Sequence, residues 1–451
     1  MRPRLDAAGE RQLLARTARA QRDGRLPSVT VAVTDERELL WSTGRGRVDG
    51  ERPTVDTQYR IGSITKTFTA VIVMQLRDEG ELALHDRVES HLPEVGAGIA
   101  DRTVAELLAH AGGVRAETSP PWWERTPGRE WEALTADLGA QGAQQGARGR
   151  FHYSNVGYAV LGELVARRRG AAWHEVLHER VLRPLGLHRT TVQPVPPVAS
   201  GSAVHPWLDV LLPEPAHDTR AMGPAGQLWS TVEDLAGWAR FLLNGSDDLL
   251  SVETLEEMLQ PRVVGDDAPV SAYGLGFDIA TVNERTLVGH GGSMPGFVAG
   301  LRIDREERIA AVALANATTG MEASLLDDLL EVVRLRSPRI VDEWIPDAEH
   351  APEVGDLVGV WYWGPRPFAL RGASGGRPEL AALEPGGRGT RLERVAPDEW
   401  VGLGGYFDGE PLRVLRRDDG EISHLELASF VFTREPHEPG DVIPGAEPWP
   451  T

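Results

Sequence analysis

The stretch Tyr59-Arg60-Ile61-Gly62-Ser63-Ile64-Thr65-Lys66 is the most informative part of this 451-residue chain. Lys66 is the only lysine among 47 lysine and arginine residues. Arginine stays charged at any working pH, whereas a buried lysine can lose its proton, so a position that keeps lysine indicates proton transfer. If a helix begins near Ser63, positions i and i+3 share one face, and the amine can approach the hydroxyl. This Ser-x-x-Lys pattern predicts a serine nucleophile with a lysine base; the alternative is a serine helix cap with an exposed lysine.

The composition of the chain argues against several classes of protein. There is no cysteine, which removes disulfides, thiolate metal sites and cysteine nucleophiles. A formal net charge of −20 argues against nucleic acid and anionic membranes as partners. No apolar run is long enough for a signal peptide or a membrane span, so we expect a cytoplasmic protein. No motif predicts a metal ion or another cofactor.

Hydrophobic periodicity predicts an antiparallel sheet whose strands are separated in the chain by a helical region. Strand segments are expected at Ser28 to Trp41, Tyr273 to Ile279, Arg285 to Val288, Val298 to Ile303 and Ile309 to Ala315. Helices are expected from about Ser63 to Arg77 and at Asp101 to His110, Val156 to Arg169, Trp173 to Val181, Thr231 to Leu243 and Ser324 to Arg334. The sheet therefore combines an N-terminal strand with several C-terminal strands, an α/β (α+β) arrangement with a helical insertion.

The pattern changes after Pro346, where short β-like segments recur between Gly, Pro and Asp turns. These segments are Leu357 to Trp363, Arg391 to Val395, Leu412 to Leu415, Ile422 to Leu427 and Phe430 to Thr433. Several short strands at this spacing predict a small antiparallel barrel or sandwich. We therefore divide the chain into a domain over residues 1–347, which carries the Ser-x-x-Lys motif, and an all-β domain over residues 348–451.

A second polar motif, Phe151-His152-Tyr153-Ser154-Asn155-Val156-Gly157-Tyr158, lies at the start of a predicted helix. Tyr153 can shuttle a proton if nearby cations lower its pKa, and Asn155 can offer its amide to a substrate carbonyl. The alternative is an ordinary helix entry with an aromatic ring packed on the core.

A third motif, Val288-Gly289-His290-Gly291-Gly292-Ser293-Met294-Pro295-Gly296, follows a predicted strand. Glycines allow a ligand to approach the backbone closely, and an edge strand offers unpaired N–H groups. A substrate that lies along this edge can receive a hydrogen bond to its oxyanion. The alternative is a hairpin or bulge with an incidental histidine.

The three motifs are more specific together than apart, with 90 residues from Ser63 to Tyr153 and 137 from Tyr153 to His290. In this order the chain resembles the penicillin-recognising serine enzymes, which include class C β-lactamases, DD-peptidases, D-aminopeptidases and related esterases. The resemblance spans roughly residues 10–335. It implies a β-lactamase/transpeptidase-like fold for the first domain and a serine hydrolase activity.

The resemblance also implies a role for each motif residue. Ser63 would be the nucleophile, Lys66 its partner base, Tyr153 the tyrosine of the second motif, and Asn155 the substrate-binding asparagine. The catalytic set is completed by His290, and the backbone N–H groups of Ser63 and Ser293 would form the oxyanion hole. Gly291 and Gly292 would lie along the substrate.

His290 departs from the lysine that many β-lactamases and cell-wall peptidases have at this place. Histidine is neutral or partly charged near neutral pH, so a fixed positive charge near a substrate carboxylate is lost. This departure weakens the case for an efficient β-lactamase. Histidine is familiar here in the esterase, aminopeptidase and thioesterase branches.

The expected cytoplasmic location favours the penicillin-binding-protein-type thioesterases, which the chain resembles in length and in an all-β, lipocalin-like C-terminal domain. This resemblance implies a nonribosomal peptide cyclase. The enzyme would take a peptidyl thioester or ester, which can be bound to a carrier protein. It would release the peptide by head-to-tail macrocyclisation at a D-configured C-terminal residue. Two alternatives stay open: a plain hydrolase (carboxylesterase, D-aminopeptidase or DD-peptidase/β-lactamase-like), and a catalytically silent peptide-binding relative.

Aromatic residues and one arginine are further candidates for substrate contact. Trp123, Trp229 and the run Trp361-Tyr362-Trp363 can line an apolar peptide groove, or they can belong to the core. Arg434 can present a charge to the site from the second domain, or it can simply end a strand.

Overall fold

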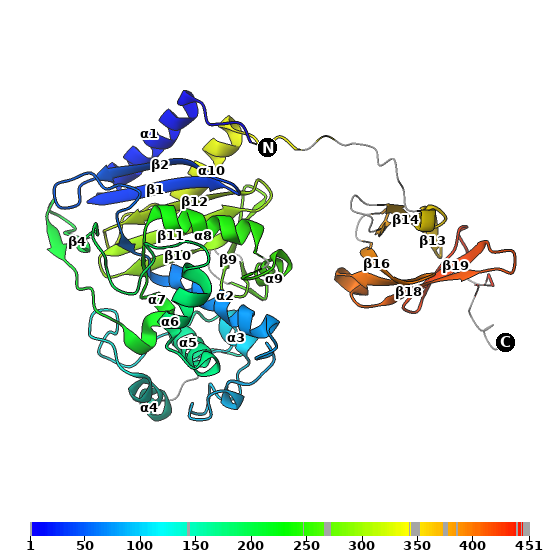
Figure 1. Ribbon diagram of the computed structural model, residues 1–451, viewed down its shortest axis with the longest axis horizontal. Coiled ribbons are helices and arrows are strands. Elements are labelled where there is room, and N and C mark those ends of the chain that lie inside the picture. The colour runs from blue at the N-terminus through cyan, green and yellow to red at the C-terminus, as the bar shows by residue number, and fades with distance from the viewer. Residues whose placement is uncertain are drawn as a thin grey trace. The chain divides into compact units, whose positions relative to one another are not determined.

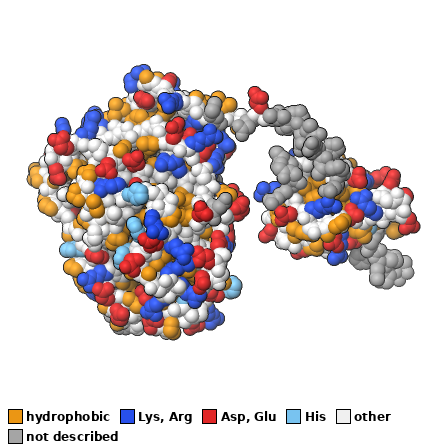
Figure 2. Space-filling view, in the orientation of Figure 1, with side chains coloured by type: hydrophobic (Ala, Val, Ile, Leu, Met, Phe, Trp, Pro, Cys, Tyr) orange, Lys and Arg blue, Asp and Glu red, His pale blue; other side chains and the backbone are white. Residues whose placement is uncertain are grey.

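The computed structural model of the chain describes residues 2–141, 145–246, 248–265, 272–341, 343, 352–372, 378–384, 387–438, 441–442 and 444. The chain divides into two compact units, Met1–Val341 and Asp342–Thr451 (Figure 1). On the visible face of the first unit, acidic and basic side chains are interspersed (Figure 2). None of the described helices is long and apolar enough to cross a membrane.

An antiparallel sheet forms the centre of the first unit. Its eight strands are β1 (Ser28–Asp35), β2 (Leu39–Gly46), β7 (Val263–Val264), β8 (Ala272–Tyr273), β9 (Asp278–Val282), β10 (Arg285–Met294), β11 (Phe297–Asp304) and β12 (Ile309–Ala315). They lie in the order β2-β1-β12-β11-β10-β9-β8-β7. The segment 28–41, expected as a strand, a charged turn at residues 35–37 and a further strand, is a hairpin, in which the Asp35 carboxylate accepts hydrogen bonds from the N–H groups of Arg37 and Glu38.

Two hydrophobic cores cover opposite faces of this sheet. In β12, Ala310, Val312 and Leu314 belong to one core, and the alternate residues belong to the other, as strand geometry requires. Helices α1 (Ala7–Asp23) and α10 (Leu325–Arg336) pack on one face, and α8 (Val232–Asn244) packs on the other (Figure 1). The sequence analysis did not predict α1, which buries a narrow stripe that includes Leu13 and Ala20.

The helical region between β2 and β7 carries most of the active-site motifs. Its helices are α2 (Thr65–Asp78), α3 (Val104–Leu108), α4 (Trp131–Gln141), α5 (Asn155–Arg169), α6 (Trp173–Leu177), α7 (Gly223–Gly226), α8 and α9 (Val252–Met258). Short elements join them: β3 (Tyr59–Arg60), η1 (Gly62–Ile64), η2 (Val88–Ser90), η3 (His178–Leu182), β4 (Ser202–Val204), β5 (Leu211–Pro213), η4 (Arg220–Met222) and β6 (Trp229–Ser230). Every residue of α2 from Thr65 to Leu76 is buried, so this helix is the rigid centre of the unit.

The second unit is an all-β near-barrel, in agreement with the predicted fold class. Its strands are β13 (Gly359–Trp363), β14 (Arg366–Gly372), β15 (Pro378–Ala382), β16 (Thr390–Ala396), β17 (Glu399–Leu403), β18 (Pro411–Arg416), β19 (Ile422–Leu427) and β20 (Phe430–Phe432), with α11 (Pro352–Gly355) and η5 (Gly405–Phe407) beside them. Each strand pairs with the next, and the backbones of Tyr362 and Thr433 exchange hydrogen bonds of 2.7 and 3.0 Å that join the two ends. The sequence missed β14, β15 and β17.

Candidate active site

Ser63 lies in the 3-10 turn η1, immediately before α2. Its hydroxyl accepts a hydrogen bond of 2.9 Å from Nζ of Lys66, one turn later on the same face. Ser63 is half-buried and therefore accessible, whereas Lys66 is fully buried. The alternative of an exposed lysine beside a serine cap does not describe this structure.

Lys66 Nζ has three hydrogen-bond acceptors, which match the three hydrogens of an ammonium group. Besides Ser63 Oγ they are Oδ1 of Asn155, at 2.6 Å, and the backbone carbonyl of Ala225 on α7, at 2.7 Å. Oδ1 of Asn155 and the carbonyl oxygen of Ala225 can only accept hydrogen bonds. When Lys66 loses a proton, its two remaining hydrogens stay on these oxygens, and its lone pair faces Ser63 Oγ. The neutral amine is thereby aimed at the proton it must remove.

Burial lowers the pKa of Lys66 to about 7 because the charged form is poorly solvated in the core. The carboxylates of Glu117, Glu124 and Asp278 act in the opposite direction and raise that pKa. The neutral base is therefore well populated near neutral pH, as a general base requires.

Glu117 is a site residue that the sequence analysis missed. Its carboxylate accepts a hydrogen bond of 2.7 Å from Nδ2 of Asn155 and one of 2.6 Å from Nε1 of Trp123. The neighbouring Ala116 carbonyl also accepts the backbone N–H of Asn155, at 2.9 Å. The loop therefore fixes the amide of Asn155 so that Oδ1 faces Lys66. No local pattern marks Glu117, since its role depends on two segments that are far apart in the sequence.

Tyr153 lies beside both catalytic groups. Lys66 Nζ lies 4.9 Å from the centre of its ring, and its hydroxyl lies within interacting distance of Ser63. Burial raises the pKa of Tyr153 well above its usual range. The sequence analysis made the proton-shuttle role of Tyr153 depend on a lowered pKa, and that condition is not met. Tyr153 keeps its proton and can act on Ser63 only as a neutral hydroxyl.

The backbone of β10 passes directly over the nucleophile turn. A Cβ atom on Gly292 would lie 1.9 Å from the Ile61 carbonyl oxygen, and one on Gly62 would lie 2.5 Å from the Ser293 nitrogen. Gly62 also has a φ of +52°, which glycine adopts without strain. These two glycines let the N–H groups of Ser63 and Ser293 approach one another, as an oxyanion hole requires. Gly291 and Ser293 are exposed on this edge.

His290 is buried in β10, with both ring nitrogens occupied. Nε2 lies 3.0 Å from the hydroxyl of Tyr273, and Nδ1 contacts the carbonyl oxygen of Gly291. Burial lowers the pKa of His290, so the ring is neutral near neutral pH. The Gly291 carbonyl can only accept, which assigns the hydrogen to Nδ1 and leaves Nε2 to accept from Tyr273. Tyr273 was not among the residues predicted from the sequence.

The aromatic candidates fall into different environments. Trp123 is buried next to the site, where its indole N–H bonds Glu117. Trp229 is buried in the core, with its ring centroid 5.2 Å from that of Phe297. Trp361 is also buried, in the core of the second unit. The geometry therefore favours the core interpretation for Trp229 and Trp361.

Arg434 makes its contacts inside the second unit. Its guanidinium donates hydrogen bonds to the backbone carbonyls of Asp356, Val358 and Val360, and it lies 3.9 Å from the centre of the Trp361 ring. These contacts join β20 to the start of β13. They favour the structural interpretation of Arg434 over a role in presenting charge to the catalytic site.

A family model describes the first unit as a whole. The model of the beta-lactamases matches residues 12–334. The chain belongs to the beta-lactamase family. As a member of that family it is a serine hydrolase or acyl-transfer enzyme. A second model, of a domain of unknown function, matches residues 350–434.

Curated relatives of this beta-lactamase family member are 23% to 29% identical to it over the aligned residues. It is 29% identical over 337 residues to Penicillin-binding protein 4 of Amycolatopsis lactamdurans, which covers 68% of this chain and 85% of the relative. It is 28% identical over 240 residues to Beta-lactamase-like protein 2 of Dictyostelium discoideum, which covers 50% of this chain. The chain spans 43% of the length of that second relative.

Solved structures with the same fold include proteins aligned over both units. A penicillin-binding protein homologue from Pyrococcus abyssi, described as octameric, aligns over 95% of this chain and 100% of its own, with a TM-score of 0.66 and 22% identity. SurE aligns over 95% of this chain and 99% of its own, with a TM-score of 0.59 and 23% identity. A D-stereospecific amidohydrolase from Streptomyces sp. aligns over 73% of this chain and 98% of its own, with a TM-score of 0.60 and 26% identity.

Among the residues that the structure describes, no group of three or more His, Asp or Glu side chains could hold a metal ion.

Proposed function

We propose that the chain is a cytoplasmic acyl-transfer enzyme that takes a peptide onto Ser63 from an ester or thioester with a D-configured terminal residue. The peptide is then released by attack of its own amine, as a macrocycle. The donor is an activated peptide, free or bound to a carrier protein. The observation that carries this proposal is the state of His290, which is buried, neutral and hydrogen-bonded to Tyr273.

A neutral His290 bears on the leaving group of the reaction. A peptidase or β-lactamase that recognises a free substrate carboxylate needs a cation beside the β10 edge, and this chain offers none at position 290. A thiol, alcohol or amide leaving group carries no carboxylate and needs no such cation. The site therefore suits donors whose terminal carboxyl group is already part of the ester or thioester under attack.

Acylation follows from the geometry around Ser63. The neutral Lys66 amine takes the hydroxyl proton as Oγ attacks the carbonyl carbon, and the resulting oxyanion accepts hydrogen bonds from the N–H groups of Ser63 and Ser293. Lys66 then returns the proton to the leaving thiolate or alkoxide, directly or through the Tyr153 hydroxyl. The acyl group is left as an ester on Oγ, and Lys66 is neutral again.

The second half of the reaction needs a nucleophile for that ester. The carboxylates of Glu117 and Glu124 give this side of the site a negative potential, which favours an approaching amine over an anion. An amine of the bound peptide attacks intramolecularly and has an effective concentration far above that of an external amine. Lys66 accepts its proton, and Ser63 Oγ leaves with a proton.

The preference for a D residue is supported by the amidohydrolase from Streptomyces sp., which is described as D-stereospecific and is 26% identical over the aligned residues. The same likeness favours a second candidate, hydrolysis of D-aminoacyl or D-peptidyl amides. In that reaction water replaces the peptide amine as the nucleophile, while the acylation step is unchanged.

Product analysis with four matched thioesters tests the proposal. The peptides have a free or acetylated N-terminus and a D or L terminal residue, and Ser63→Ala is the control for covalent catalysis. A cyclic product from the free-amine D peptide alone is expected, with a mass adduct on the wild-type protein and none on Ser63→Ala. Linear acid as the only product supports the hydrolase. An undiminished rate in Ser63→Ala contradicts both.

A further inference from the structure

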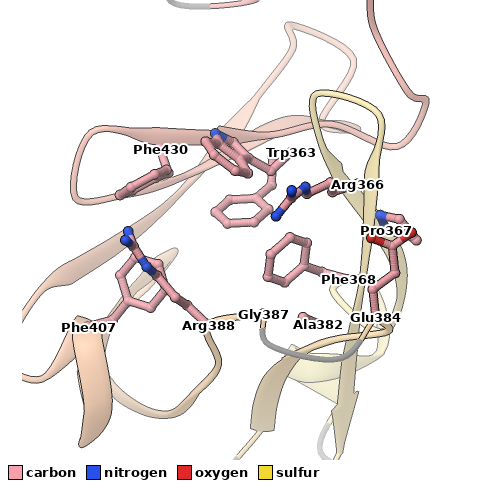
Figure 3. Close-up of a pocket in the computed structure, with 11 residues that line it drawn as sticks. Trp363, Arg366, Pro367, Phe368, Ala382, Glu384, Gly387, Arg388, Phe407 and Phe430 are labelled. Carbon is pink, nitrogen blue, oxygen red and sulfur yellow. The ribbon is translucent and has the colours of Figure 1, made fainter.

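A cavity of about 320 Å³ opens in the near-barrel of the second unit (Figure 3). Five aromatic side chains line it, together with charged side chains: Trp363, Phe368, Phe407, Phe430, Phe432, Arg366, Arg388 and Glu384. Its volume is in the range of small-molecule sites, which are often found at the mouths of β-barrels. Neither the family assignment nor the proposed reaction uses this cavity.

Strand alternation explains why these residues meet. On β14, Phe368 and Leu370 are buried, so Arg366 shares their inward face at the beginning of the strand. On β13, the buried Trp361 in the same way places Trp363 on the inward face at the end of the strand. Trp363 and Arg366 pair across the Gly364-Pro365 turn, and Trp363 is 41% exposed because the barrel opens there.

The aromatic walls are held in place by contacts with one another. The ring of Phe430 lies 5.4 Å from that of Trp363 and 5.6 Å from that of Phe407, in both cases nearly edge to face. Phe368 and Phe432 form a similar pair at 5.1 Å. Rings fixed in this way bind an apolar group at little cost in conformational entropy.

Arg366 is an exposed member of the lining, at the open end of the barrel. Its side chain is directed toward the rings of Trp363 and Phe368 (Figure 3). Among the described residues it has no ion pair and no side-chain hydrogen bond, whereas Arg388 lies 3.6 Å from the centre of the Tyr406 ring. Inward charges protect exposed sheet edges from pairing, but β14 is paired on both sides and has no edge to protect. An inward guanidinium beside apolar rings is instead suited to an anionic group on an apolar ligand.

We propose that this cavity binds a small organic carboxylate with an aromatic body. The ring of the ligand packs among Trp363, Phe368 and Phe430, and its carboxylate accepts hydrogen bonds from the Arg366 guanidinium. Two guanidiniums against the single carboxylate of Glu384 leave the lining with a net positive charge, opposite to that of the chain as a whole.

Fluorine NMR on the full chain tests this site. The probes are 3-(4-fluorophenyl)propionate and the matched neutral alcohol, 3-(4-fluorophenyl)propan-1-ol. We expect saturable line broadening by the carboxylate, with weaker binding of the alcohol. Arg366→Gln should weaken binding of the carboxylate by about tenfold and leave the alcohol unchanged, because only the charge-assisted hydrogen bonds are lost.

Two further variants separate recognition from loss of structure. Arg371→Gln lies on the outward face of the same strand and removes the same charge, so binding should stay within the error of the measurement. Arg366→Lys keeps the charge and should retain more binding than Arg366→Gln. The proposal is overturned if the carboxylate does not bind, if the alcohol binds equally well, or if Arg371→Gln weakens binding as much as Arg366→Gln.

Discussion

The side chains of Glu117 and Asn155 form a hydrogen bond of 2.7 Å that decides which atom of the Asn155 amide faces Lys66. A carboxylate can only accept, so it must meet the NH2 group, and Oδ1 is turned toward Nζ. Because Oδ1 in turn can only accept, the lone pair of a neutral Lys66 is directed to Ser63. A residue that touches neither the nucleophile nor its base thereby orients both.

Glu117→Gln tests this positioning role through a pH profile. Loss of the carboxylate lowers the pKa of Lys66, since Glu117 raises it, so the acidic limb of kcat/KM should move to lower pH. The plateau should also fall, by about 10- to 100-fold, because the glutamine has one acceptor oxygen for the two donors Asn155 Nδ2 and Trp123 Nε1, and its NH2 group opposes the other donor, so the amide of Asn155 is held less firmly. Glu124→Gln is the control. Glu124 also raises the pKa of Lys66, but its carboxylate bonds only the indole N–H of Trp122. The acidic limb of kcat/KM should therefore shift to lower pH without a fall in the plateau. Equal plateaus in the two variants would contradict the role.

The pH dependence of the wild-type protein should follow the titration of Lys66. Below pH 7 the amine is protonated and cannot act as a base, so kcat/KM should rise as the pH increases through about 7. Lys66→Arg keeps a charge but cannot accept a proton, and it should lose about 100-fold or more of the rate, as Lys66→Ala does. Stopped-flow acylation with an activated ester measures both effects. A Lys66→Arg protein with most of its activity would make Lys66 an electrostatic residue.

The close approach of β10 to the nucleophile turn predicts opposite results for two neighbouring glycines. Gly292→Ala places a methyl group against the Ile61 carbonyl, which should destabilise the protein by about 1–3 kcal/mol and separate the two oxyanion donors. The acylation rate should fall by about 100-fold. A Cβ on Gly291 meets nothing within 4 Å, so Gly291→Ala should unfold at the wild-type temperature and keep its activity on small esters. Thermal unfolding and ester assays on both variants decide the point.

His290→Lys tests the argument that links the proposed substrate to a missing cation. A lysine at this position lies near Asp278, which favours its charged form. Turnover of donors whose leaving group bears a carboxylate should rise by about fivefold relative to donors with a neutral leaving group. Tyr273→Phe removes the hydroxyl partner of His290 without adding charge, and it should leave this ratio unchanged. If both variants change the ratio equally, the charge at position 290 does not set leaving-group preference.

The elements that the sequence predicted well are those with a strong local apolar signal. The hairpin of β1 and β2, the helices α2, α5 and α8, and the strands β11 and β12 are near their expected positions, because each is a continuous or periodic apolar stretch bounded by turn or capping residues. The missed strands β14, β15 and β17 are short and carry polar or exposed residues at outward positions. Their pairing depends on neighbouring strands more than on their own composition.

The sequence by itself determined that Ser63 and Lys66 meet, because residues three apart on one helical turn share a face whatever the rest of the chain does. It also determined the family resemblance, since the order and spacing of three motifs are properties of the chain. Only the tertiary structure decided how these groups act. It placed Glu117 against Asn155, joined His290 to Tyr273 and buried Lys66. The physical reason is that hydrogen-bond direction and solvation, which set both protonation and orientation, arise from contacts between segments far apart in the sequence.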